Sequence, residues 1–180
     1  MGRPVRSSCG RTVSEILPRT NELGRMTAKT PPELDHLRHI LTRDLGALAA
    51  EVRESPADLL WESAPGITNS VGTLAIHLCG NLRHFIGHHL GDDGYVRQRE
   101  QEFAGHPLPK DEVLAEIDRA RSAVDTALFN LDPTRLDALM PSPPPHHAGR
   151  TVRFFLIQLS THLSRHTGQA NYLRRILTAR

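Results

Sequence analysis

Four stretches of the chain repeat apolar residues at every third or fourth position, and segments rich in proline or glycine separate them. This period is that of an amphipathic α-helix. We therefore expect helices over about 31–54, 70–90, 110–131 and 151–178. The segment 132–150 contains five prolines and cannot form a helix interior. An all-α fold results, and an antiparallel four-helix bundle is its simplest architecture.

The starts of the first two helices carry recognisable signals. Thr30 is a candidate N-cap, and the two prolines that follow it suit a first helical turn. Asn69 or Ser70 is expected to cap the second helix. The stripe that the first helix should bury is Leu34, Leu37, Leu41, Leu45, Leu48 and Val52.

The composition fits one domain of about 150 residues behind a short leader. We predict a disordered leader over 1–29, where no apolar period is sustained, and a helical domain over 30–180. Met26 is an alternative start, which would make 1–25 an extension. Five Arg and two Glu in 1–25 leave 26–180 with a net charge of −1. That part has no basic surplus, so we expect no nucleic-acid partner.

Neither membrane insertion nor a disulfide framework is indicated. The chain has no apolar stretch near the roughly 20 residues of a membrane span, and its N-terminus lacks the apolar core of a signal peptide. Its two cysteines, Cys9 and Cys79, are far apart in sequence. We expect a cytoplasmic protein without a membrane partner, and Cys79 as a small core residue.

Two histidines stand out on the apolar seam of the fourth helix, which we place along Val152, Phe155, Leu159, His162, His166, Gln169, Leu173 and Ile176. His162 and His166 are four residues apart, which puts their imidazoles on one face about 6 Å apart. Such a pair can chelate one metal ion. The alternatives are two hydrogen-bonded core histidines, or a seam that ends at Leu159.

A third ligand is available on the second helix, where His77, Asn81, His84 and His88 form a polar stripe beside the apolar arc. His77 lies nearest the middle of the helix, so we expect it to point inward. His84 and His88 lie towards the Gly91 turn and are expected to be exposed histidines at the helix end.

The remaining histidines are assigned to the surface and to loops. His36 and His39 lie opposite the leucine stripe of the first helix. His89 belongs to the end of the second helix, and His106 to a loop. The pair His146 and His147 is expected to lie in a mobile loop, with a cover over the mouth of the site as the alternative.

Three motifs in this order resemble the DinB-like (YfiT-like) family of metalloenzymes. They are the segment 64–78, which begins Ala-Pro-Gly-Ile-Thr-Asn-Ser and contains His77 near its end, the Arg-Gln-Arg-Glu-Gln-Glu-Phe of 97–103, and the His-Leu-Ser-Arg-His-Thr-Gly-Gln of 162–169. The resemblance covers about 30–178. It implies an up-down-down-up four-helix bundle, commonly a homodimer, with His77, His162 and His166 as metal ligands.

Three neutral imidazoles leave a coordination position open, as in catalytic rather than structural zinc sites. The donor set suits zinc, nickel, cobalt or iron(II), and we expect zinc or nickel. Asn81 and Gln169 are candidates for orienting the imidazole rings. Glu100 or Glu102 is a candidate general base, with surface charge as the alternative role.

The resemblance leads to three functional hypotheses. Some relatives are thiol-dependent, so metal-dependent S-transfer from a low-molecular-weight thiol to a small-molecule electrophile is the first. Metal-dependent hydrolysis is the second, and a non-catalytic, stress-associated metal- or ligand-binding protein is the third. A base close to the metal would favour hydrolysis, and a pocket with cationic residues beside it would favour thiol transfer.

Overall fold

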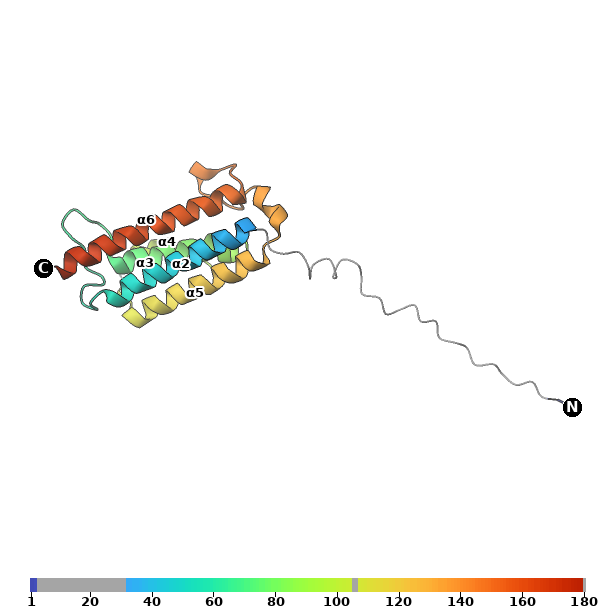
Figure 1. Cartoon of the computed structure of the whole chain (residues 1–180), viewed down its shortest axis with the longest axis horizontal. Coiled ribbons are helices and arrows are strands. Elements are labelled where there is room, and N and C mark those ends of the chain that lie inside the picture. Colours follow the sequence, from blue (N-terminus) through green and yellow to red (C-terminus); the bar gives the residue numbers. More distant parts are fainter. Residues whose placement is uncertain (3–31, 105–106, 180) are drawn as a thin grey trace.

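The computed structural model describes residues 1–2, 32–104 and 107–179 (Figure 1). The predicted leader lies almost entirely outside the described residues, as do Thr30 and His106. Over the described part the chain is all-α and contains no strand, which confirms the predicted fold class. An isolated bridge between Leu139 and Thr151 is the one β-type pairing found there.

Four long helices account for most of the fold. Their bounds are α2 Pro32–Glu54, α3 Val71–Leu82, α5 Lys110–Asn130 and α6 Val152–Thr178. Ser70 caps α3 by accepting a hydrogen bond from the Thr73 amide. It is one of the two N-cap residues predicted for this helix. Thr151 caps α6 in the same way, through the Phe154 amide. These boundaries agree with the predicted ranges except at the end of the second helix.

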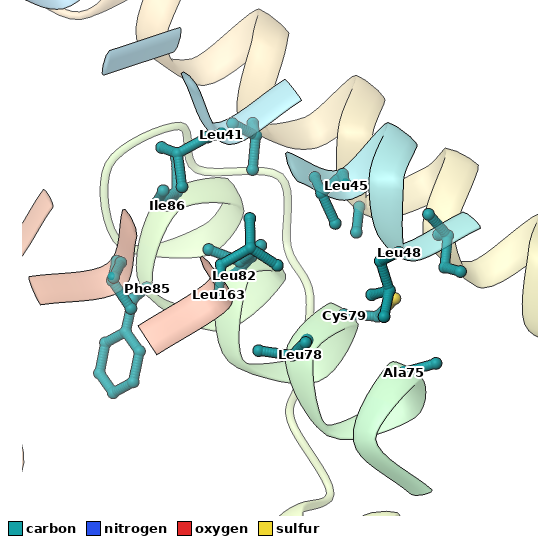
Figure 2. Close-up of a cluster of buried hydrophobic side chains, with 14 of the residues drawn as sticks. Leu41, Leu45, Leu48, Ala75, Leu78, Cys79, Leu82, Phe85, Ile86 and Leu163 are labelled. Atoms are coloured by element: carbon teal, nitrogen blue, oxygen red, sulfur yellow. The ribbon is translucent and has the colours of Figure 1, made fainter. Parts of the chain in front are cut away.

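The four helices lie lengthwise beside one another (Figure 1). α2 and α3 each pack against both α5 and α6, so the core lies between all four. Every residue of the predicted α2 stripe is buried. Figure 2 shows Cys79 within the buried cluster, as expected of a small core residue. The up-down-down-up order of the helices stays a prediction from the resemblance.

The second helix departs from the prediction after Leu82. Residues Arg83–His88 form a π-helix, in which the His89 amide donates to the His84 carbonyl five residues back. A further short helix, α4 (Arg99–Glu102), lies between the second and third predicted helices. The proline-rich segment holds two 3₁₀ turns, Pro133–Asp137 and Pro145–His147. Across the described residues, no helix combines the length and apolarity that a membrane crossing requires.

Candidate metal centre

The three histidines singled out from the sequence come together between α3 and α6. His77 lies in the middle of α3 and is 9% exposed. His162 and His166 lie one turn apart on α6 and are half-buried. The Nε2 atoms of His77 and His162 are 3.1 Å apart, and one nitrogen from each of the three rings lies within 4.8 Å of the other two. Within the described ranges, no other group of histidine, cysteine or carboxylate side chains converges in this way.

The spacing of these nitrogens fits a small divalent ion. Two imidazole nitrogens bound at 2.0–2.1 Å in tetrahedral geometry lie about 3.3–3.4 Å apart. The observed 3.1 Å between His77 and His162 is close to that value. The three ring centroids are 4.4–5.7 Å apart, with each pair edge-on to the other. Small side-chain rotations would bring all three nitrogens to bonding distance.

His77 is held by a buried carboxylate. Its Nδ1 lies 3.0 Å from Oε2 of Glu102, which α4 supplies and which is 7% exposed. An ionised carboxylate only accepts, so Nδ1 carries the proton and donates it. Nε2 then carries no proton, and its lone pair faces His162. A carboxylate bonded in this way to a metal-binding histidine fixes its tautomer and makes the ring a better ligand.

Arg97 in turn holds Glu102. Its Nε and Nη2 atoms donate to the two carboxylate oxygens at 2.7 and 2.8 Å. Burial alone would raise the pKa of Glu102, but the hydrogen bonds from Arg97 and His77 outweigh it and hold that pKa below its usual value. Arg97 Nη2 also lies 3.4 Å from His77 Nδ1. Because a single tautomer cannot satisfy both contacts, we assign the proton to the shorter bond with Glu102.

The two histidines of α6 are also prepared to bind as neutral rings. His166 Nδ1 donates to Oε1 of Gln169 at 2.5 Å, which leaves Nε2 free. Burial and the neighbouring histidines lower the pKa of His162 to about 4. Burial likewise lowers the pKa of His166, although the bond to Gln169 opposes that shift. Both rings therefore offer lone pairs at neutral pH.

The position of the pair on α6 corrects the predicted seam. Leu156, Leu163, Ala170 and Leu177 are buried, whereas Gln169 and Ile176 are exposed. α6 packs against both α2 and α3, so its buried face is broad and is centred to one side of the predicted line. The two histidines are half-buried and accordingly lie at the margin of the core, and His162 also lines a cavity.

The π-helix changes the setting of the other histidines on this element. His84 and His88 are half-buried rather than exposed, so that prediction was wrong. A π-turn stacks residues five apart, and the rings of His84 and His89 have their centroids 4.6 Å apart. Asn81 makes no hydrogen bond through its buried Oδ1, so the structure gives the ring-orienting contact to Gln169 and not to Asn81.

A cavity of about 690 Å³ lies against the candidate centre and includes His77 and His162 in its wall. Its polar lining residues include Asn81, Arg97 and Arg99, and its apolar lining residues are Phe85, Phe155, Leu159 and the three prolines 143–145. His146 and His147 also line it, which supports the alternative of a cover over the site. His36 and His39 are away from it on α2, both exposed as predicted.

The candidate bases do not occupy the role expected of them. Glu102 is engaged by Arg97 and His77, and Glu100 is exposed. No described carboxylate lines the cavity.

A second cavity, of about 570 Å³, is lined by Glu102 and Gly80 but by none of the three histidines. Arg97 was not predicted as a functional residue, although the motif at 97–103 contains it.

Comparisons with known proteins place this geometry in a family context. The family model described as mycothiol-S-transferase matches residues 36–179, which include all three histidines, Arg97 and Glu102. A search of curated proteins gives no match.

Proposed function

Because the chain belongs to the mycothiol-S-transferase family, we propose that it is a metal-dependent enzyme that joins a low-molecular-weight thiol, through its sulfur, to a small electrophile. One observation carries the proposal: the three-histidine cluster meets a cavity with two arginines and no described carboxylate. Arginine side chains favour an anionic ligand such as a thiolate. Mycothiol, from the family description, is the first thiol to test.

His77, His162 and His166 are the proposed ligands, with zinc or nickel as the proposed ion. Three neutral imidazoles leave at least one coordination position for a substrate atom. An ion held there would lower the pKa of a bound thiol and so favour the thiolate near neutral pH. Glu102 and Gln169 keep the Nδ1 protons of His77 and His166 in place, so that the Nε2 lone pair of each ring would be available to the ion.

The cavity provides for both reactants. Arg99 is the guanidinium free of a carboxylate partner among the contacts found, and it lies 5.4 Å from the Phe103 ring centroid. Its charge favours the thiolate form. Phe85 and Phe155 have ring centroids 4.8 Å apart and form an apolar wall for the electrophile. In the transfer step the thiol has lost its proton to solvent, its sulfur bonds to carbon, and the leaving group departs with the electron pair of the broken bond.

Hydrolysis is less well supported. A hydrolytic enzyme needs a group that takes a proton from water, and a carboxylate near the ion is the usual choice. Both carboxylates considered from the sequence are unsuited, since Glu102 is hydrogen-bonded by Arg97 and Glu100 lies outside the cavity lining. The non-catalytic alternative is separated from transfer by an activity measurement.

The test combines elemental analysis with thiol consumption. We expect about one divalent transition-metal ion per purified chain, and enzyme-dependent loss of mycothiol in the presence of monochlorobimane. His162→Leu should lose both properties. His36→Leu, which changes an exposed histidine of α2, is the matched control and should retain them. Thiol loss that persists after complete metal removal would reject the proposal, and metal binding without thiol loss would favour the non-catalytic alternative.

A further inference from the structure

We infer that Gly80 is a positioning residue of the candidate metal centre: its missing side chain makes the space in which Glu102 reaches His77. Gly80 lies one turn after His77 on α3. The inference rests on the proposed function only through the ion, because the hydrogen bond between Glu102 and His77 is a property of the metal-free protein.

The position that a Cβ atom of residue 80 would take is occupied by the Glu102 carboxyl group. A Cβ atom built on Gly80 would lie 2.1 Å from Glu102 Oε1 and 2.9 Å from its Cδ. Side-chain carbons do not approach other heavy atoms so closely, so any residue except glycine must displace this carboxylate. Tyr95 Oη, at 3.5 Å, is the next atom that such a Cβ would meet.

The carboxylate has little freedom to move away. Its Oε1, the atom that meets the Cβ, accepts the 2.7 Å bond from Arg97 Nε. Its Oε2 accepts from both Arg97 and His77. The Arg97 and Glu102 side chains are 9% and 5% exposed, so neither can exchange these bonds for water in place. Retreat of Glu102 therefore breaks the contact that orients His77.

Helix propensity alone predicts that Gly80→Ala stabilises α3, so a loss of zinc affinity in this variant would be informative. Alanine is a better helix former than glycine in a helix interior. Gly80→Ala should thus favour α3 itself, and a loss of function must come from the displaced carboxylate. A methyl group on Gly168 of α6 would meet no atom within 4 Å, although that residue lies two positions after His166. Gly168→Ala is therefore the matched control near the same site.

The first measurement is zinc affinity, by competition with a chromogenic chelator. Loss of a contact that orients a metal ligand typically weakens binding 10- to 100-fold. We expect a loss of about that size for Gly80→Ala and a change below about twofold for Gly168→Ala. In a Glu102→Ala background, Gly80→Ala should change affinity little, since there is no carboxylate left to displace. An equal loss in both backgrounds would overturn the inference, because Gly80 would then act by another route.

The second measurement needs no metal. In ¹⁵N-labelled metal-free protein, the His77 Nδ1 proton bonded to Glu102 should give a slowly exchanging signal, assigned by its absence in His77→Gln. That signal should be lost in Gly80→Ala and kept in Gly168→Ala. Its persistence in Gly80→Ala would overturn the inference. If the wild-type protein binds neither zinc nor nickel, but the signal is still lost in Gly80→Ala and kept in Gly168→Ala, the proposed function is rejected and the role of Gly80 stays supported.

Discussion

The imidazoles of His77 and His162 face each other through their Nε2 atoms at 3.1 Å, although the residues are 85 positions apart in sequence. Glu102 keeps the proton of His77 on Nδ1, so in the metal-free protein His162 must donate its own Nε2 proton across this contact. A cation can replace that proton between the two rings. The pair thus connects α3 and α6 in the metal-free protein, and would also do so with a cation between the rings.

Zinc should raise the melting temperature of the wild-type protein and not that of His162→Leu. Binding to the native state alone contributes RT ln(1 + [L]/Kd), about 2.7 kcal/mol at 100 times Kd. The comparison is made by calorimetry with excess chelator and with excess zinc. A zinc response in the variant as large as that of the wild type would contradict the assignment of His162 as a ligand.

Arg97→Met should destabilise the fold, because it leaves the buried carboxylate of Glu102 without its guanidinium partner. Removing one member of a buried ion pair typically costs 3–5 kcal/mol, and we expect about 3 kcal/mol here. Urea unfolding measures the change. Arg99→Met, at an exposed neighbour on α4, should change the free energy of unfolding by less than about 0.5 kcal/mol. Equal losses of stability in the two variants would show that the ion pair between Arg97 and Glu102 is not the cause.

The metal-free protein should lose stability as the pH falls from about 6.5 towards 4. Burial and the neighbouring histidines lower the pKa of His84 to about 4, and burial lowers that of His89. The unfolded chain, with ordinary histidine pKa values near 6.5, therefore takes up protons before the native state does. Chemical unfolding across this range should show a shallower decline for His84→Gln. Parallel curves for the two proteins would refute the role of His84.

Gln169→Leu should weaken zinc binding about tenfold, the lower end of the range for residues that orient a ligand. The side chain accepts the Nδ1 proton of His166, but it is exposed, so water can partly replace it. Chelator competition gives the affinity. Ser164→Ala, at an exposed position on the same helix, should leave that affinity unchanged.

Local patterns were enough to predict the four helices and the three converging histidines. The α2 stripe is entirely buried because each leucine follows the helical period. His162 and His166 share a face through their spacing alone, and His77 points inward from the middle of α3. That these residues bind metal, and that the chain forms a homodimer, stay predictions.

Features that depend on contacts between distant segments could not be predicted in the same way. The hydrogen bond between His77 and Glu102 spans 25 residues, and the sequence does not show which glutamate is buried. The π-helix at Arg83–His88 has no apolar period that would distinguish it from an α-helix. The seam of α6 was misplaced because its buried face depends on two neighbouring helices.

α6 carries two of the three proposed ligands, and this sets an order of events during synthesis. A ribosome that has just made His77 must add 85 further residues before His162 exists. Until then a nascent chain can collapse around α2, α3 and α5, but it presents at most one of the three imidazoles. Binding of the proposed ion would consequently be a late event in the maturation of this chain, after its helical core has begun to form.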